Sequence, residues 1–239
     1  MNRLAIFDLD GLLIDSEPWH CKSYQEVFQL VPKEFGLEPV YLSEKEYFKL
    51  WSSEGHSTEA AVDRYYPDLP IDIREALIAR IRSQKMKIYS RFIKQGKIPL
   101  QEGVHNLLKS LLSKIDLVLA SDSSRPSVDE LVQKHNLEVY FNKNIYTKET
   151  VGTRKPNPYL FFYVADQKSV SDKECIVLED AMKGLRAAKA ANMKCIICPN
   201  EYTLPRFRNA KRYFKDADLV VKSLKLLNYD ILKNLQYKK

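Results

Sequence analysis

Residues 4–11, Leu-Ala-Ile-Phe-Asp-Leu-Asp-Gly, join a short apolar run directly to two carboxylates. The run Leu4–Phe7 predicts a strand that is buried on both faces, because no polar residue interrupts it. In extended chain, residues two apart point the same way, so Asp8 and Asp10 share one side. Ligands bind at the carboxyl ends of strands in open α/β sheets, and two adjacent anions there favour a divalent cation such as Mg²⁺. The alternative interpretation of Asp-Gly is a simple turn.

Five further apolar runs have the length and composition of buried strands. Helical patterns separate the later runs; apolar residues recur between Val104 and Ile115, for example, at the spacing of one helix face. Strands that alternate with helices predict a doubly wound α/β domain with a parallel sheet. The expected strands cover residues 116–120, 144–146, 175–178, 194–198 and 219–221.

The interval from residue 16 to residue 97 breaks this alternation. It contains helical patterns and no clear strand, including a long helix whose apolar residues run from Ile73 to Phe92 and which ends near Gly96. We therefore expect an all-helical insert, residues 16–97, that closes over the substrate as a lid. The α/β core then consists of residues 1–15 and 98–239.

Composition and charge exclude several classes of protein. The 239 residues are 45% hydrophobic and 29% charged, as in globular chains, and no apolar run approaches the roughly 20 residues that span a bilayer. The first residues lack the uninterrupted apolar stretch of a signal peptide, so we expect a cytoplasmic protein with no membrane partner. The net charge is +7, but the lysines and arginines are scattered, so we expect no nucleic-acid partner.

Polar residues also follow two of the other expected strands. Ser121-Asp122-Ser123 comes after the run 116–120, and Glu179-Asp180 comes after the run 175–178. Each group has a plainer interpretation, since hydroxyls cap helices and acids favour the N-terminal end of a helix. Lys155 stands before two prolines, where the plain interpretation is a solvated surface group. The joint pattern of three polar strand ends and one cation on a stiff turn favours a shared site.

Four stretches together resemble the motifs of the haloacid dehalogenase superfamily. They are residues 8–20 (DLDGLLIDSEPWH), 118–124 (VLASDSS), 154–158 (RKPNP) and 177–193 (VLEDAMKGLRAAKAANM). The resemblance is to the phosphatase and β-phosphoglucomutase-like branch, in which a helical cap follows the first motif directly. It implies a Rossmann-like core, a cap that selects the substrate, and phosphoryl transfer.

The resemblance also implies roles for individual residues. Asp8 resembles the nucleophile that becomes an aspartyl phosphate, and Asp10 resembles the general acid that protonates the leaving group. Ser121 resembles the residue that hydrogen-bonds the transferring phosphoryl group, and Lys155 the residue that neutralises its charge and that of Asp8. The implied Mg²⁺ ligands are Asp8, Asp10 through its backbone carbonyl, and Asp180, with Glu179 acting directly or through water.

Six further positions are expected to contact the substrate. They are Gly11, Asp122 and Ser123 in the core, and Glu17, His20 and His56 in the insert. His20 lies next to the mouth of the implied site, although a histidine that packs at the hinge fits equally well. His56 belongs to a Gly-His-Ser-Thr turn that resembles the specificity turn of the cap, although a solvated loop residue fits equally well.

The resemblance favours a Mg²⁺-dependent phosphatase that acts on a small phosphorylated metabolite of the sugar or polyol phosphate class, expected to be a monomer. The alternative in the same fold is a phosphosugar mutase similar to β-phosphoglucomutase. That branch carries an arginine in the specificity turn, where this sequence has Thr58. A dehalogenase lacks the second acid, whereas Asp10 is present, and a non-catalytic binding protein is expected to have lost at least one central residue.

Overall fold

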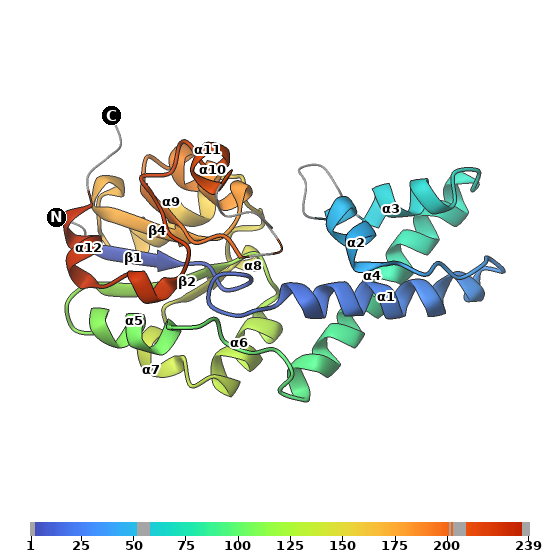
Figure 1. Ribbon diagram of the computed structural model, residues 1–239, viewed down its shortest axis with the longest axis horizontal. Helices are drawn as coiled ribbons and strands as arrows, with labels where there is room; N and C mark the ends of the chain where they lie inside the picture. The colour runs from blue at the N-terminus through green and yellow to red at the C-terminus, as the bar shows by residue number, and fades with distance from the viewer. Residues whose placement is uncertain (1–2, 52–57, 201, 203–208, 236–239) are drawn as a thin grey trace. The chain divides into compact units, whose positions relative to one another are not determined.

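The computed structural model describes residues 3–51, 58–200, 202 and 209–235 of the chain. Its internal contacts divide the chain into two compact units, Met1–Asp15 with Pro99–Lys239, and Ser16–Ile98. The first unit is an α/β domain, and the second is built from helices (Figure 1). Within the described ranges, no helix has the length and apolar composition to cross a bilayer.

The α/β unit contains one sheet of six parallel strands in the order β3-β2-β1-β4-β5-β6. This arrangement confirms the doubly wound α/β fold class. The chain builds outward from β1 in one direction and then in the other, so the reversal point lies between β1 and β4, where such folds bind ligands. The strands are β1 (Leu4–Phe7), β2 (Asp116–Ser121), β3 (Ile145–Thr147), β4 (Cys175–Glu179), β5 (Lys194–Ile197) and β6 (Leu219–Val220).

Two strands run further than the sequence predicts, and the difference matters for the site. β2 includes Ser121 and β4 includes Glu179, because these residues pair with Thr147 of β3 and Ile197 of β5. Both polar residues are therefore held by the sheet itself rather than by a following loop. The other strands agree with the predicted runs to within one residue at each end.

Helices cover both faces of this sheet, which explains why its strands read as uninterrupted apolar runs. Leu4 and Ile6 face one layer, formed by α9, α10 and α11, and join its apolar core. Phe7 faces the other layer, where its ring meets Phe141 of α7 edge-on, with 5.8 Å between ring centroids. Figure 1 shows α5, α6 and α7 on that second face.

One helix of the α/β unit, α5, begins where the expected apolar pattern begins, at Val104. α5 is shorter than the apolar pattern that continues to Ile115, because the chain turns at Ser113, whose φ is 64°. The helices are α5 (Val104–Leu111), α6 (Arg125–Lys134), α7 (Glu138–Phe141), α8 (Lys148–Val151), α9 (Tyr159–Gln167), α10 (Met182–Ala190), α11 (Ala210–Tyr213) and α12 (Tyr229–Asn234), with short 3-10 turns at Asp172–Glu174 and Leu224–Leu226.

The second unit consists of α1 (Glu17–Glu34), α2 (Glu44–Trp51), α3 (Thr58–Tyr65) and α4 (Ile71–Lys94). α4 is the expected long helix, and the chain leaves it at Gly96 with a φ of 65°. Leu77, Ile81 and Phe92 are buried along it, as the pattern predicts. Ile73 is 37% exposed instead, because it lies in the first turn of α4, before the packed part of the helix begins.

Candidate active site

The first motif passes from the end of β1 into a tight turn. Asp8 follows β1 directly, and its backbone N–H donates to the Leu178 carbonyl of β4 at 3.0 Å. The chain then turns tightly at Gly11, which has a φ of 86°, where L side chains are strained. A Cβ atom at Gly11 would lie 2.2 Å from an Asp180 carboxylate oxygen. Gly11 is therefore needed for the close approach of the first and fourth motifs, and it offers no side chain to a substrate.

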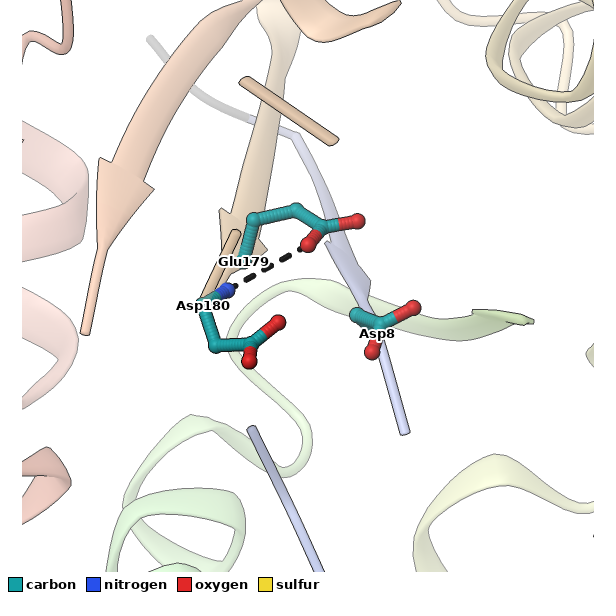
Figure 2. A group of neighbouring side chains, drawn as sticks. All are labelled: Asp8, Glu179 and Asp180. Carbon is teal, nitrogen blue, oxygen red and sulfur yellow. Dashed lines mark hydrogen bonds between the residues drawn. The ribbon is translucent and has the colours of Figure 1, made fainter. Parts of the chain in front are cut away.

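Three buried carboxylates meet at the reversal point of the sheet. Asp8, Glu179 and Asp180 each offer an oxygen within 4.8 Å of the others (Figure 2). Burial of several carboxylates together is unfavourable without a compensating cation. Carboxylate oxygens are the ligands that Mg²⁺ prefers, so this donor set fits the expected metal.

Asp10 does not contribute its side chain to this group. Its carboxylate accepts a hydrogen bond from the Ser123 hydroxyl at 2.6 Å. The Asp10 carboxylate lies outside the group of Asp8, Glu179 and Asp180, and the family resemblance implies the backbone carbonyl of Asp10 as the ligand. The hydrogen bond also gives Ser123, expected at the substrate, a definite partner in the first motif.

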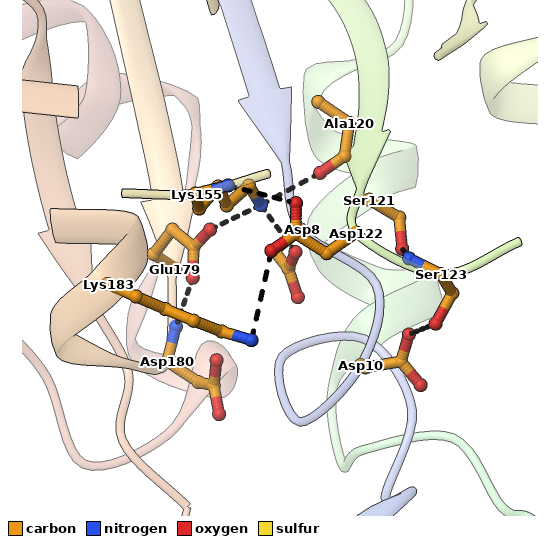
Figure 3. Close-up of polar contacts among 10 residues, drawn as sticks. All are labelled: Asp8, Asp10, Ala120, Ser121, Asp122, Ser123, Lys155, Glu179, Asp180 and Lys183. Atoms are coloured by element: carbon orange, nitrogen blue, oxygen red, sulfur yellow. Dashed lines mark hydrogen bonds and ion pairs between the residues drawn. The ribbon is translucent and has the colours of Figure 1, made fainter. Parts of the chain in front are cut away.

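Lys155 lies between the first and fourth motifs, fully buried. Its ammonium donates to Asp8 Oδ1 at 2.6 Å, to Glu179 Oε1 at 2.5 Å and to the Ala120 carbonyl at 3.0 Å (Figure 3). An ammonium has three hydrogens, so all three are used by protein acceptors. The contact with Asp8 is the one that the resemblance implies.

Electrostatics in this group favour a bound cation. Burial, together with the negative charges of Glu179 and Asp10, raises the pKa of Asp8 to about 8 against the lowering effect of Lys155. Burial opposes the charged form of Lys155, but Asp8 and Glu179 together raise its pKa above the ordinary value. The ammonium therefore stays charged and compensates only part of the negative charge around Asp8.

The second motif forms a hydrogen-bonded turn beyond β2. Ser121 is buried, and its hydroxyl oxygen accepts the backbone N–H of Ser123 at 3.0 Å. Asp122 accepts the backbone N–H of Lys155 at 3.2 Å. A carboxylate has no hydrogen to donate to a phosphate, so the Asp122 side chain joins the second motif to the third rather than contacting phosphate oxygens.

Two residues near the site were not predicted from the sequence. The Lys183 ammonium, near the start of α10, lies 3.8 Å from Asp122 Oδ2. Asn200 donates to Asp180 Oδ2 at 2.9 Å. Asn200 lies just beyond β5, so the rule that strand ends share one edge of the sheet offered a signal for it.

The residues expected in the insert lie within the helical unit. His20 stacks on Tyr89 with 4.1 Å between ring centroids, and its Nδ1 lies 2.8 Å from the Lys85 ammonium. Glu17 accepts a hydrogen bond from the Tyr47 hydroxyl at 3.2 Å. His56 lies outside the described residues.

Relatives of known name share most of the length of this chain. Protein CbbY of Cereibacter sphaeroides is 27% identical over 207 residues, which span 85% of this chain and 86% of the relative. A phosphorylated carbohydrates phosphatase of Thermotoga maritima is 26% identical over 201 residues, or 80% of this chain and 82% of the relative.

Solved structures and a family model lead to the same assignment. Two crystal structures of CbbY from Rhodobacter sphaeroides, one with phosphate and one of a variant with xylulose-(1,5)bisphosphate, superpose with TM-scores of 0.72 and 0.74. Both are 25% identical in sequence and cover 94% of this chain and 96% of their own. The family model of haloacid dehalogenase-like hydrolases matches residues 5–198, which contain all four motifs. This chain therefore belongs to the haloacid dehalogenase-like hydrolases.

Proposed function

We propose that this hydrolase is a Mg²⁺-dependent phosphatase that acts on a small phosphorylated sugar through an aspartyl phosphate on Asp8. The names of its relatives support this substrate class, since one acts on phosphorylated carbohydrates and another binds a sugar bisphosphate. The observation that carries the proposal is the buried contact of 2.6 Å between Lys155 and Asp8. That contact favours the charged form of Asp8 and fixes one carboxylate oxygen, while the other remains available to attack phosphorus.

The first half-reaction needs one nucleophile and one proton donor. A carboxylate oxygen of Asp8 forms a bond to phosphorus as the bond from phosphorus to the sugar oxygen breaks. Asp10, which Ser123 holds by its 2.6 Å hydrogen bond, gives its proton to the departing oxygen. The products are the dephosphorylated sugar and an acyl phosphate on Asp8.

The second half-reaction returns the enzyme to its starting state. Asp10, now ionised, takes a proton from water as the water oxygen bonds to phosphorus and the bond to Asp8 breaks. Mg²⁺ held by Asp8, Asp180 and the Asp10 carbonyl would offset the negative charge on the phosphoryl oxygens. Glu179 supports this arrangement by holding Lys155 at 2.5 Å.

A panel of phosphorylated sugars and polyols tests the proposal. We expect phosphate release from at least one sugar phosphate, and loss of that release when a chelator removes Mg²⁺. Asp10→Asn should slow release by at least about a hundredfold, because it removes the proton donor. Asp166→Asn, at an exposed position of α9, is the matched control and should retain wild-type activity.

Two outcomes would contradict the proposal. Undiminished phosphate release after chelation would exclude the magnesium-dependent mechanism. Conversion of a sugar phosphate to its positional isomer faster than phosphate release, in the presence of a sugar bisphosphate, would establish the mutase instead.

A further inference from the structure

Lys155 has no ammonium hydrogen left for an incoming phosphoryl group. Its three hydrogens point to Asp8, Glu179 and the Ala120 carbonyl, at distances of 2.5 to 3.0 Å. The side chain is only 1% exposed, so it has little freedom to turn toward a ligand without breaking one of these contacts. A second cationic side chain beside Asp8 would therefore strengthen the binding of a phosphoryl group.

The site as a whole carries a surplus of negative charge. The residues drawn in Figure 3 include two lysines, Lys155 and Lys183, and five carboxylates. With Asp10 protonated, as the first half-reaction requires, bound Mg²⁺ would bring the formal charge of this group from minus two to zero. A phosphate ester brings about two further negative charges at neutral pH, so each lysine matters to its binding. The carboxylates are those of Asp8, Asp10, Asp122, Glu179 and Asp180.

Lys183 is placed to supply the second cation. It is the second residue of α10, which begins two residues after Asp180, and its side chain extends across the site toward Asp122 (Figure 3). The electrostatic influence of Asp122, followed by that of Asp8 and Glu179, raises its pKa despite desolvation, so the ammonium is charged at neutral pH. It therefore lies within electrostatic reach of the group that is to be phosphorylated.

The present partner of Lys183 holds it weakly. Its ammonium lies 3.8 Å from Asp122 Oδ2, which is too long for a hydrogen bond, and its side chain is 60% exposed. Exposed ion pairs of this kind contribute little to stability. A phosphate dianion offers more charge and more acceptor oxygens than one carboxylate, so exchange of Asp122 for the ligand is favourable.

We propose that Lys183 is a substrate-binding residue of this site, released by Asp122 to donate to the phosphoryl oxygens of the bound ester. The proposal rests on the proposed phosphatase function and adds a residue to it. Because Lys183 would bind the phosphoryl group in the ground state and in the transition state alike, its removal should raise KM and leave kcat nearly unchanged.

Three variants test this role in the full-length protein. Lys183→Met removes the charge, Lys183→Arg keeps it, and Lys173→Met removes an exposed charge at the opposite end of β4 as a matched control. Two measurements apply to each: steady-state hydrolysis of p-nitrophenyl phosphate, and calorimetric titration with inorganic phosphate in the presence of Mg²⁺. Thermal melting confirms that the exposed substitutions leave folding unchanged.

The expected result is a loss of affinity specific to the charge at position 183. Lys183→Met should raise both KM and the dissociation constant of phosphate by about tenfold, the loss of one charge-assisted hydrogen bond, with kcat within about twofold of wild type. Lys183→Arg should restore most of the affinity, and Lys173→Met should match wild type.

Three results overturn the role of Lys183. Equal phosphate affinities in wild type and Lys183→Met contradict the role of Lys183, and so does the absence of phosphate binding to both proteins. A fall in the kcat of Lys183→Met at constant KM also contradicts it. Failure of the proposed function would look different, because the wild-type enzyme would then release no phosphate from any ester. In that case the calorimetric comparison still decides whether Lys183 binds phosphate.

Discussion

At the scale of single residues, Lys155 decides the charge state of the site. Its ammonium is buried between Asp8 and Glu179, and each carboxylate loses its principal compensation when the lysine is removed. The same contacts orient Asp8. We therefore expect both the stability of the fold and the activity to depend on the Lys155 side chain. A substitution there should therefore appear in both unfolding and turnover.

Lys155→Met is predicted to destabilise the protein and to abolish activity. Breaking a buried ion pair by removal of one partner lowers the free energy of unfolding by about 3–5 kcal/mol. Chemical denaturation, followed by fluorescence, measures this change, with Lys173→Met as the exposed control. An unfolding free energy equal to that of wild type would show that Lys155 does not compensate the carboxylates.

Gly11→Ala tests the close approach of the first and fourth motifs. The new Cβ would lie 2.2 Å from Asp180 Oδ2, so Asp180 must move and Mg²⁺ binding should weaken. Gly152→Ala is the matched control, because Gly152 also has a positive φ, of 69°, but meets nothing within 4 Å. Both variants should lose about 1–2 kcal/mol through backbone strain.

The rise in melting temperature that Mg²⁺ causes distinguishes the effects of the two substitutions. We expect it to be nearly lost in Gly11→Ala and fully retained in Gly152→Ala. Equal responses of the two variants to Mg²⁺ would mean that Asp180 does not need its present position to bind the metal.

At the scale of elements, α10 packs against the end of β4 through a glycine. A Cβ at Gly184 would lie 1.9 Å from the Glu179 carboxyl carbon. In an open helix, replacement of glycine by alanine stabilises by about 1 kcal/mol. Overpacking costs about 1–3 kcal/mol or more, and here it displaces a buried carboxylate, so the steric effect should exceed the gain in helix propensity.

Gly184→Ala should therefore be less stable than wild type and less active. Thermal unfolding and phosphate release measure the two effects, and they should fall together because Glu179 holds Lys155. A variant that melts at or above the wild-type temperature would show that α10 moves aside without disturbing Glu179.

The sequence predicted the elements where local pattern decides them. Uninterrupted apolar runs predicted the strands, because both faces of the sheet are covered. The extension of β2 to Ser121 and of β4 to Glu179 depends on pairing with neighbouring strands, which a single local pattern does not contain. The early end of α5 follows from the positive φ of Ser113, a residue without a strong turn signal.

At the scale of the whole molecule, we expect pH and Mg²⁺ to act on the same group, the carboxyl of Asp8. Burial raises the pKa of Asp8 to about 8, whereas the unfolded chain ionises it near the ordinary value of 3.8. In the metal-free protein, rising pH therefore ionises the unfolded state first, and this group lowers stability progressively up to about pH 8. Mg²⁺ held as we propose would reverse the effect, because it would bind the ionised carboxylate in the folded state.

We predict that Mg²⁺ raises the melting temperature more at about pH 8 than at about pH 6, since protons compete with the metal for Asp8. Differential scanning calorimetry at both pH values, with and without Mg²⁺, measures the shift. Asp8→Asn removes the titrating group and should remove most of the difference between the two pH values. An identical shift at both pH values in the wild-type protein would contradict the coupling.

The sequence predicted those parts of the site that lie at the ends of strands. Parallel strands end at one edge, so Asp8 and Glu179 were expected together, and the structure places them so. The turn of the Asp10 carboxylate to Ser123 and the reach of Lys183 to Asp122 depend on side-chain directions across separate loops. Such contacts follow from the assembled fold rather than from any one segment.

Contacts between separate segments of the chain were also unpredicted in the helical insert. His20 belongs to α1, whereas its neighbours Lys85 and Tyr89 belong to α4, far along the chain. Helical periodicity predicted α4 and a helical insert around it, but it did not predict which polar residues of α1 and α4 would meet. Residues that contact one another across helices therefore need the structure.

Detection of a covalent intermediate tests most directly whether Asp8 attacks phosphorus, as we propose. The enzyme is mixed rapidly with a sugar phosphate that it hydrolyses, quenched with acid and analysed by peptide mass spectrometry. One phosphoryl group should appear on Asp8, and none should appear in Asp8→Asn. Phosphate release by Asp8→Asn at the wild-type rate, with no phosphorylated peptide in the wild-type enzyme, would contradict the account.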